Sequence, residues 1–465
     1  MSAGFEEGDL LIELQSVERP WPRVVDPRPA APEMRRVSEP SVFEWVVAVF
    51  AVIIQMGAFV SLDLVVGGGS LRGDVRDPLN TVCIALSAAT VGVLSVARMR
   101  QLGSLALRNG FSVLFALLVL LSALWSIHPD VTLRRGAGYL LTMLIAGFLC
   151  VRFDADDRVR VLSWGFALSA IASALFVAFF PQYGIMRGPD LGGDWRGVFP
   201  HKNVLGSVMA VAVFCELYLL VRCNGRPRFR WALLSVYLVL VTLSHSATAW
   251  LLTLLYLGGT GLYVLWKRDR LMAAVVTLSG ILALLAVAVG MWDDPSAPLR
   301  LLGKDMTLTG RTTLWEVVLA FIRERPLLGW GYHAMWQLHD PTTTFADKLT
   351  GGWGVTGSHN AFLEITLELG LVGVGLMLIV LGVAFWRALR ACGVGLLPLG
   401  WFCLIYMVGA ILSAQVGETL GQNQVIEWVA FNVLSFSCGF ELVSHQWRRR
   451  ARLIVAEATH AVASS

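Results

Sequence analysis

Apolar stretches of about 20 residues, separated by short polar connections, recur along most of this chain of 465 residues. A helix needs about 20 mostly apolar residues to cross the hydrocarbon core of a bilayer. We therefore predict an all-α, polytopic integral membrane protein with about twelve transmembrane helices. The twelve stretches cover residues 42–66, 79–97, 110–127, 136–151, 159–180, 203–222, 230–244, 246–266, 270–292, 361–386, 393–413 and 425–444.

The composition supports a membrane protein over other classes. Charged residues make up 15% of the chain and hydrophobic ones 56%, whereas about a quarter of the residues in soluble domains are charged. The net charge of +4 is too small to indicate a nucleic-acid partner. The seven cysteines show no CxxC spacing and lie in apolar runs or at ends predicted to be cytosolic. They indicate neither a disulfide framework nor a zinc site.

The basic residues predict how the chain is oriented. Residues 1–40 hold six prolines among charged residues and no apolar run, which predicts a disordered cytosolic tail and not a signal peptide. With this end inside, nearly every Lys/Arg cluster between apolar stretches is cytosolic, as the positive-inside rule requires. The domain organisation that follows is transmembrane helices 1–9 in 41–292, a large periplasmic loop in 293–360, helices 10–12 in 361–445 and a basic cytosolic tail in 446–465.

The large loop is long enough to form structure of its own. Residues 313–316 have the spacing of a capping box, and Pro326 marks a helix end. We predict an amphipathic helix between them that lies flat on the membrane surface. Its apolar residues recur at helical period: Leu314, Val317, Val318, Phe321 and Ile322.

The most specific motif begins where the large loop ends. His359-Asn360 is followed, after nine residues, by Gly370-Leu-Val-Gly373. Here the sequence resembles the O-antigen ligase and Wzy-type polysaccharide polymerase family of bacterial envelope glycosyltransferases. That family carries His-Asn (or Ser or Gln), nine residues and Gly-x-x-Gly at this place in its topology.

Other motifs extend this resemblance over residues 110–375, in order and on the same side of the membrane. The stretch 196–203 (RGVFPHKN) resembles the motif before the sixth span in the exopolysaccharide-polymerase branch. One departure is Ala247, which stands where many relatives have Arg or Lys. The remaining matches are Ala123-Leu-Trp-Ser126, Thr132-Leu-Arg134-Arg135, Gly310–Trp315 and Pro326–Gly331.

The resemblance implies a GT-C-like fold and an enzyme that needs neither a metal nor a cofactor. It would transfer a glycan, with inversion, from an undecaprenyl-diphosphate-linked donor to a sugar hydroxyl at the periplasmic face of the bacterial cytoplasmic membrane. The motif at 196–203 favours polymerisation of exopolysaccharide or O-antigen repeat units. The alternative within the family is a ligase that attaches glycan to lipid A core. The implied partners are the donor, a glycan or lipid A core acceptor, the lipid bilayer and other polysaccharide assembly proteins.

The chemistry suggests a role for each candidate residue. His359 titrates near neutrality, and a helix N-terminus disfavours its cationic form, so it is the candidate base. The leaving diphosphate needs cations, and Arg pairs with phosphate oxygens through two hydrogen bonds. We predict His359 and Arg311 as catalytic. The candidates for substrate binding are Arg196, Lys202, Arg134, Arg135, His245, Asn360 and Glu368.

The basic candidates also have simpler explanations. Arg311 could anchor the surface helix to lipid headgroups, and Arg134 and Arg135 could snorkel to the interface. Arg196 and Lys202 share their loop with two aspartates, so ion pairs within the loop compete with substrate binding. The aspartates are Asp190 and Asp194.

The remaining candidates leave alternatives open as well. His359 could be an interfacial residue without a catalytic role. Glu364 and Glu368, four apart on one helix face, could orient basic groups or pair within the bundle. A flippase or solute transporter would instead place its charges at mid-membrane, among helices broken in paired halves. A membrane scaffold would tolerate loss of His359.

Overall fold

The computed structural model describes residues 39–57, 78–187, 193–222, 227–293, 311–337, 357–417 and 419–463. The chain divides into two units, Met1–Glu39 and Pro40–Ser465, and the described helices belong to the second. Most of the predicted tail 1–40 lies outside the described residues. So do residues 294–310 and 338–356 of the predicted large loop.

Helices form all the regular structure of the described residues, apart from one isolated bridge between Ile185 and Trp195. The first half contains α1 (Val42–Ile54), α3 (Pro78–Val96), α4 (Met99–Arg108), α5 (Gly110–Leu121), the 3-10 turn η2 (Ser122–Leu124), α6 (Pro129–Arg152), α7 (Ala155–Phe179), α8 (Pro181–Gly184) and α9 (Lys202–Arg222). The second half contains α10 (Pro227–Leu243), α11 (Ala247–Arg268), α12 (Arg270–Asp293), α14 (Arg311–Glu324), α16 (Ala361–Gly393), α17 (Leu397–Ala414) and α18 (Ile426–Ala463).

Each of the twelve predicted apolar stretches overlaps one of these helices. Within the described residues, seven helices are long and apolar enough to cross a membrane, namely α6, α7, α9, α11, α16, α17 and the first 26 residues of α18. The pair α3 and α4, bent by 99°, would add an eighth. Helices α1 and α5 are apolar but shorter. The protein is therefore a polytopic, all-helical membrane protein, while a total of twelve spans stays a prediction.

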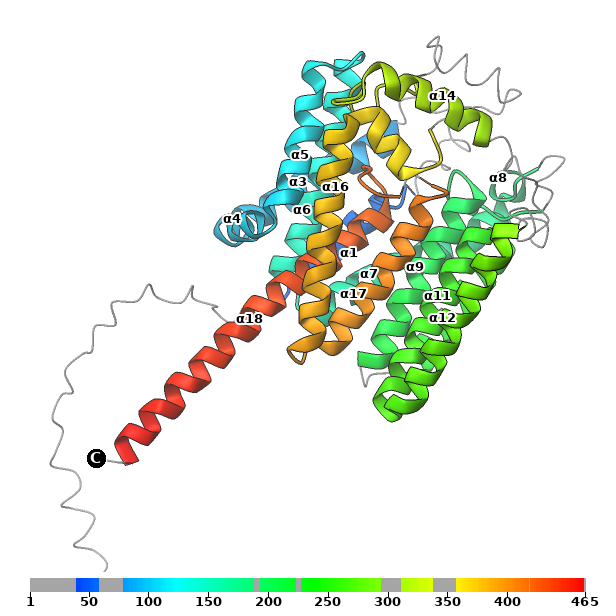
Figure 1. Ribbon diagram of the computed structural model, residues 1–465. Helices are drawn as coiled ribbons and strands as arrows, with labels where there is room; N and C mark the ends of the chain where they lie inside the picture. Colours follow the sequence, from blue (N-terminus) through cyan, green and yellow to red (C-terminus); the bar gives the residue numbers. More distant parts are fainter. Residues whose placement is uncertain are drawn as a thin grey trace, which may run out of the picture. The chain divides into compact units, whose positions relative to one another are not determined.

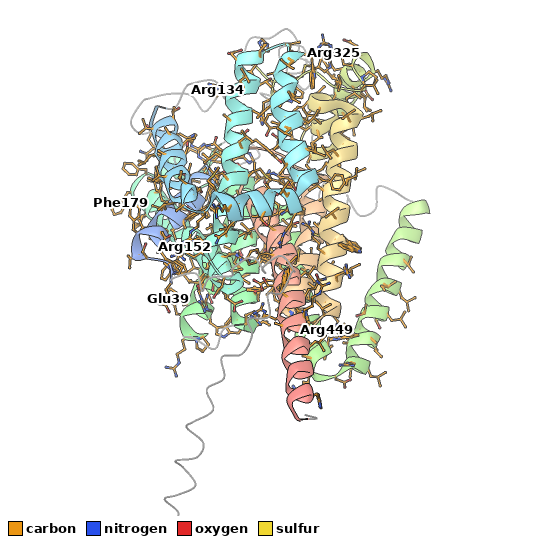
Figure 2. The ribbon with its side chains drawn as sticks, turned by 90° about the vertical axis from the view of Figure 1, so that its left-hand side faces the viewer. Glu39, Arg134, Arg152, Phe179, Arg325 and Arg449 are labelled. Atoms are coloured by element: carbon orange, nitrogen blue, oxygen red, sulfur yellow. The ribbon has the colours of Figure 1, made fainter. Side chains whose placement is uncertain are left out.

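Successive long helices run in opposite directions, so their connections fall at two ends of a bundle (Figure 1). We call one of them the His359 end; it carries the connections α5–α6, α7–α9, α10–α11, α14–α16 and α17–α18. Figure 2 shows Arg134 and Arg325 toward this end, and Arg152 and Arg449 toward the opposite end. The basic clusters predicted to be cytosolic follow α6, α9, α11 and α16, and therefore gather at the opposite end.

Helix α9 forms the centre of the bundle and contacts α7, α10, α11 and α17. It is buried along most of its length because its residues are apolar on all sides. Aromatic rings fix its contact with α11 and α17: Phe214 lies 5.1 Å from the ring of Tyr256 and 5.0 Å from that of Tyr406. This packing brings the starts of α9 and α11 together at the His359 end.

Among the helices that extend beyond the predicted boundaries, α6 and α18 change where predicted residues lie. Helix α6 begins at Pro129, seven residues before the predicted span, so Arg134 and Arg135 lie in its second turn. Helix α18 continues to Ala463, so most of the predicted cytosolic tail is a continuation of the last helix (Figure 1).

Candidate functional site

Helix α16 is interrupted at Gly370, whose backbone has φ 65° and ψ −166°. A break of this kind frees backbone groups that must find other partners. Residues 326–331, which follow α14, supply these partners. The four backbone hydrogen bonds run from Trp330 N to Leu367 O (3.0 Å), Gly331 N to Glu368 O (2.9 Å), Leu371 N to Pro326 O (2.8 Å) and Val372 N to Leu327 O (3.2 Å).

Two glycines of the sequence motifs make this contact possible. A Cβ atom at Gly370 would lie 2.2 Å from the carbonyl carbon of Leu327. At Gly329, whose φ is also 65°, a Cβ would lie 2.5 Å from the carbonyl carbon of Glu368. Positive φ and close backbone approach both require glycine. The first glycine of the Gly-x-x-Gly motif is thus needed to dock the segment 326–331 on α16.

His359 directly precedes the N-terminus of α16. Asn360 is the N-cap: its Oδ1 accepts hydrogen bonds from the backbone N–H groups of Phe362 (3.0 Å) and Leu363 (3.1 Å). This capping role explains an Asn after the histidine, while a contact of Asn360 with substrate stays a prediction. The His359 side chain is half-buried, and its backbone has a φ of 53°.

Four non-glycine residues of the described chain have positive φ, and all four lie in connections at the His359 end. They are His245, His333, His359 and Gln424. Such backbone is uncommon outside glycine, although His and Asn adopt it more readily than most residues. Backbone strain persists where the surrounding structure fixes it, and it concentrates at functional sites. This distribution identifies the His359 end as the candidate functional face.

Helix α14 differs from its prediction in two respects. It begins at Arg311, so Thr313 lies inside the helix and is not its N-cap. Its apolar face packs against α16, whereas the prediction placed this face on the membrane surface. Buried Leu314 and Val318 contact Leu367 of α16, and the indole N–H of Trp315 donates to the Ser358 carbonyl at 2.9 Å.

The side chain of one predicted site residue, Arg311, lies outside the described part of the structure. Arg311 is the first residue of α14. The helix that carries it holds the connection leading to His359 through Trp315. The catalytic role of Arg311 stays a prediction.

Glu364 and Glu368 bind connecting segments to α16. Both side chains are buried. Glu364 accepts hydrogen bonds from the indole N–H of Trp336 (2.6 Å) and the backbone N–H of Ser358 (2.8 Å). Since Ser358 adjoins His359, this carboxylate helps to position the candidate base.

Glu368 has the same kind of role one turn further along. Its Oε1 accepts from the backbone N–H of His333 (2.9 Å), and its Oε2 from the side-chain amide of Gln422 (3.3 Å). These bonds give Glu368 a structural function. The predicted contact with substrate is not needed to explain it and stays a prediction.

Tyr332 joins three connections at the same level. Its backbone N–H donates to Ser122 Oγ (3.1 Å), and its carbonyl accepts from Thr132 Oγ1 (2.9 Å). Its hydroxyl donates to the Gly421 carbonyl (3.1 Å) and accepts from the Asn423 N–H (2.9 Å). The matched stretches at 123–135 and 326–331 are therefore packed together, and the α17–α18 connection joins them. The sequence alone does not predict that Tyr332 joins these connections.

His333 and Arg135 form the titratable part of this region. Burial, together with the positive charge of Arg135, lowers the pKa of His333 from 6.5 to about 3, and the Gln422 side chain opposes part of this shift. His333 is therefore neutral at physiological pH. Arg134, by contrast, is exposed at the surface of α6. Of the two predicted arginines, Arg135 is the one whose charge acts on His333. We call Arg135, Tyr332, His333, Glu368 and Gln422 the Glu368 junction.

A second group of candidates surrounds Asp194. Lys202 Nζ is paired with Asp194 Oδ2, and His245 Nδ1 lies 2.7 Å from Asp194 Oδ1. Burial alone would raise the pKa of Asp194, but its hydrogen bonds and charge interactions with Lys202 and His245 lower it. The ion pair within the loop, considered above as an alternative, is therefore present for Lys202; Asp190 lies outside the described residues.

Arg196 supports the same loop from inside. Its side chain is buried, its Nε donates to the Tyr183 carbonyl (2.6 Å), and Nη1 lies 3.5 Å from the Pro200 carbonyl. Desolvation lowers the pKa of Arg196. We call Asp194, Arg196, Lys202 and His245 the Asp194 cluster.

The described candidates thus form two groups, and the connections that carry them lie at one end of the bundle (Figure 1). The Asp194 cluster is held by the α7–α9 and α10–α11 connections, whereas the Glu368 junction is held by α6, α16 and the α17–α18 connection. His359 and Asn360 stand at the start of α16. Joint action of His359 and the Asp194 cluster stays a prediction.

Comparison with known proteins gives two matches. Residues 231–378 match the family model described as O-antigen ligase, a range that begins within α10 and includes α11, α12, α14, His359 and Gly370. The exopolysaccharide production protein ExoQ of Rhizobium meliloti is 28% identical over 291 residues. This similarity covers 59% of the chain and 64% of that relative, so less than two thirds of the relative is spanned. Both matches confirm the predicted resemblance to the O-antigen ligase and polysaccharide polymerase family.

Proposed function

We propose that this protein is an inverting, metal-independent glycosyltransferase of the bacterial inner membrane. Its donor would be an undecaprenyl-diphosphate-linked glycan, and its acceptor a sugar hydroxyl at the periplasmic face. The observation that carries this proposal is the gathering of strained histidines and basic side chains at a single end of the bundle, with His359 at the start of α16. The similarity to an exopolysaccharide production protein favours polymerisation of repeat units over ligation to lipid A core.

In the proposed reaction, the acceptor oxygen attacks the anomeric carbon of the donor sugar from the face opposite the diphosphate. A new C–O bond forms as the bond from this carbon to the diphosphate oxygen breaks, and the diphosphate leaves with the electron pair. The acceptor proton passes to His359. General base catalysis contributes about 10²–10⁴-fold. Charge stabilisation of the leaving group by Arg196, Lys202 and Arg311 would add to this.

The proposal requires the His359 end to be periplasmic. The basic clusters at the opposite end support this orientation. An alkaline phosphatase fusion at residue 190 should be active, and a green fluorescent protein fusion at residue 224 should be fluorescent. The reverse pattern would contradict the proposed topology of twelve spans.

Replacement of His359 by Asn tests the proposed base. Asn tolerates positive φ, so the backbone is preserved while the base is removed. With the purified protein and lipid-linked glycan from a strain that lacks this chain, we expect transfer to fall about 10²–10⁴-fold, with unchanged thermal stability. His445→Asn, on α18 away from the His359 end, should retain full activity. Full activity of His359→Asn would exclude His359 as the base.

The acceptor is identified by a separate measurement. Labelled lipid-linked repeat is supplied to the protein with and without lipid A core. Longer lipid-linked chains in both samples indicate a polymerase. Label transferred to the core indicates a ligase.

One observation favours a second candidate, a flippase or transporter. Helix α16 is broken at Gly370, and broken helices are typical of transport paths. However, the backbone groups freed by this break bond to residues 326–331 and do not line a path. Movement of labelled lipid-linked glycan across the bilayer of proteoliposomes, without formation of a glycosidic bond, would support the flippase or transporter hypothesis.

A further inference from the structure

Polar atoms without hydrogen-bond partners gather in the α17–α18 connection and the neighbouring His333. Five of the twelve buried, unpartnered side-chain atoms of the described residues are found there. Buried polar groups are nearly always hydrogen-bonded, so such a concentration needs an explanation. The atoms are Thr419 Oγ1, Gln422 Oε1, Asn423 Oδ1, Gln424 Nε2 and His333 Nε2. We call these five residues the Gln422 cluster.

The cluster lies against the start of α6 and α16. Gln422 is held by its hydrogen bond to Glu368, and the Asn423 backbone is held by the Tyr332 hydroxyl. A Cβ atom on Gly138 of α6 would lie only 3.0 Å from Asn423 Nδ2, so the absence of a side chain there leaves room for the amide. Arg135, one turn before Gly138, is close enough to lower the pKa of His333.

The cluster is fixed in place before any ligand arrives. Gln422 is 2% exposed and Asn423 8% exposed, so neither can rotate freely into solvent. His333 and Gln424 have φ values of 55°. Strained backbone of this kind persists only where its surroundings determine it. Rigidly held polar groups are what a specific binding site needs.

The types of atom indicate the ligand. The Gln422 and His333 side chains interact with each other. The polar atoms left for a ligand are therefore those of Thr419, Asn423 and Gln424. The carbonyl oxygen of Asn423 accepts hydrogen bonds only, the Gln424 amide donates, and the Thr419 hydroxyl does both. An ionised phosphate has no hydrogen to offer an amide oxygen, whereas a sugar hydroxyl both donates and accepts. The combination therefore fits sugar hydroxyls and not a diphosphate.

We propose that the Gln422 cluster is a subsite that binds hydroxyl groups of one sugar residue of the glycan substrate. This inference rests on the proposed function and adds that the glycan and the lipid diphosphate bind at different places. The glycan would be recognised beside α6, α16 and the α17–α18 connection, and the lipid diphosphate elsewhere on the His359 end.

Two probes distinguish binding of the glycan from binding of the lipid diphosphate. One is the repeat-unit oligosaccharide released from its lipid by mild acid, which carries sugar without diphosphate. The other is undecaprenyl diphosphate, which carries diphosphate without sugar. Binding of each to the full-length protein in nanodiscs is measured by calorimetry, so that turnover is not required.

Asn423→Ala should weaken oligosaccharide binding about tenfold, the loss expected for one hydrogen bond to a buried group. Binding of undecaprenyl diphosphate should not change. Gln415→Ala is the matched control, because this amide belongs to the same connection but its side chain is exposed. It should bind both probes as the unmodified protein does. If Asn423→Ala lowers thermal stability, Gln424→Gly replaces it, because glycine suits the positive φ at that position.

Asn423→Asp distinguishes sugar from phosphate. The carboxylate keeps the accepting oxygen, so oligosaccharide binding should remain within about threefold of normal, since accepting oxygens are preserved. Selective loss of undecaprenyl diphosphate binding in this variant would overturn the proposal. So would unchanged oligosaccharide binding in a stable Asn423→Ala protein. If the unmodified protein binds neither probe, the proposed function itself fails.

Discussion

The Asp194 cluster and the Glu368 junction use a carboxylate in different ways. Asp194 is paired with two cationic or titratable side chains, and His245 remains 60% exposed at its side chain. Glu368 is fully buried and accepts hydrogen bonds from a backbone N–H and a side-chain amide. Ion pairs near solvent exchange partners at little cost, whereas bonds to buried backbone fix geometry. The comparison suggests an adaptable site for a charged group beside a rigid framework.

The sharpest test of the rigid framework is Gly370→Ala. The added Cβ would meet the Leu327 backbone and require a positive φ, so docking of residues 326–331 on α16 should fail. We expect the free energy of unfolding to fall by about 4 kcal/mol or more, measured by thermal unfolding in nanodiscs. Gly375→Ala, on the same helix with open space around its Cβ position, is the control. Equal stability of the two variants would show that the break in α16 is not required.

The next largest effect should come from Glu368→Ala. This change leaves two buried donors, the His333 N–H and the Gln422 amide, without their acceptor. The expected loss of stability is about 3 kcal/mol. Glu441→Ala removes a carboxylate whose partner, Arg448, is exposed, and should cost less than about 1 kcal/mol. Similar losses in both variants would show that Glu368 is held no more tightly than a carboxylate in an exposed ion pair.

His333 should make the Glu368 junction sensitive to acid. Its pKa is about 3 in the folded protein and 6.5 ordinarily, so the unfolded chain binds this proton first as the pH falls. Stability should therefore decrease from pH 6.5 downward, by about 1 kcal/mol near pH 5.5. His333→Asn, which tolerates the positive φ, should reduce this slope. Thermal unfolding between pH 7.5 and 5 measures it, and the same slope in both proteins would contradict the assignment.

The helices were predictable because apolar stretches of sufficient length have few alternatives in a bilayer. The chain order of the motifs also predicted that their residues would gather at one end. The sequence did not show which structural role each residue of a motif has. Gly-x-x-Gly does not reveal that Gly370 has positive φ, since that follows from the position of Leu327.

The packing and hydrogen-bond partners of individual residues could not be predicted from the sequence either. The apolar period of α14 predicts an apolar face but not whether lipid or α16 covers it. Asn360 was predicted to bind substrate, and the structure shows that it serves as an N-cap. The residues Gln422, Asn423 and Gln424 were a signal that could have been used, because three amides in succession are unusual between two apolar spans. Their burial, however, depends on Tyr332 and Gly138, which are distant in sequence.

The smallest effect is expected where the comparison began, at Asp194. Because the partners of Asp194 are partly exposed, Asp194→Asn should lower the free energy of unfolding by less than about 1 kcal/mol at neutral pH and low salt. The pKa of Asp194 is below its ordinary value of 3.8, so its contribution is present above that pH and is lost as the pH falls below it. High salt should reduce it as well. A double-mutant cycle with Lys202→Met isolates the pair. A coupling energy of about 3 kcal/mol or more would mean that Asp194 is as rigidly held as Glu368, and the separation of an adaptable charged site from a fixed framework would then fail.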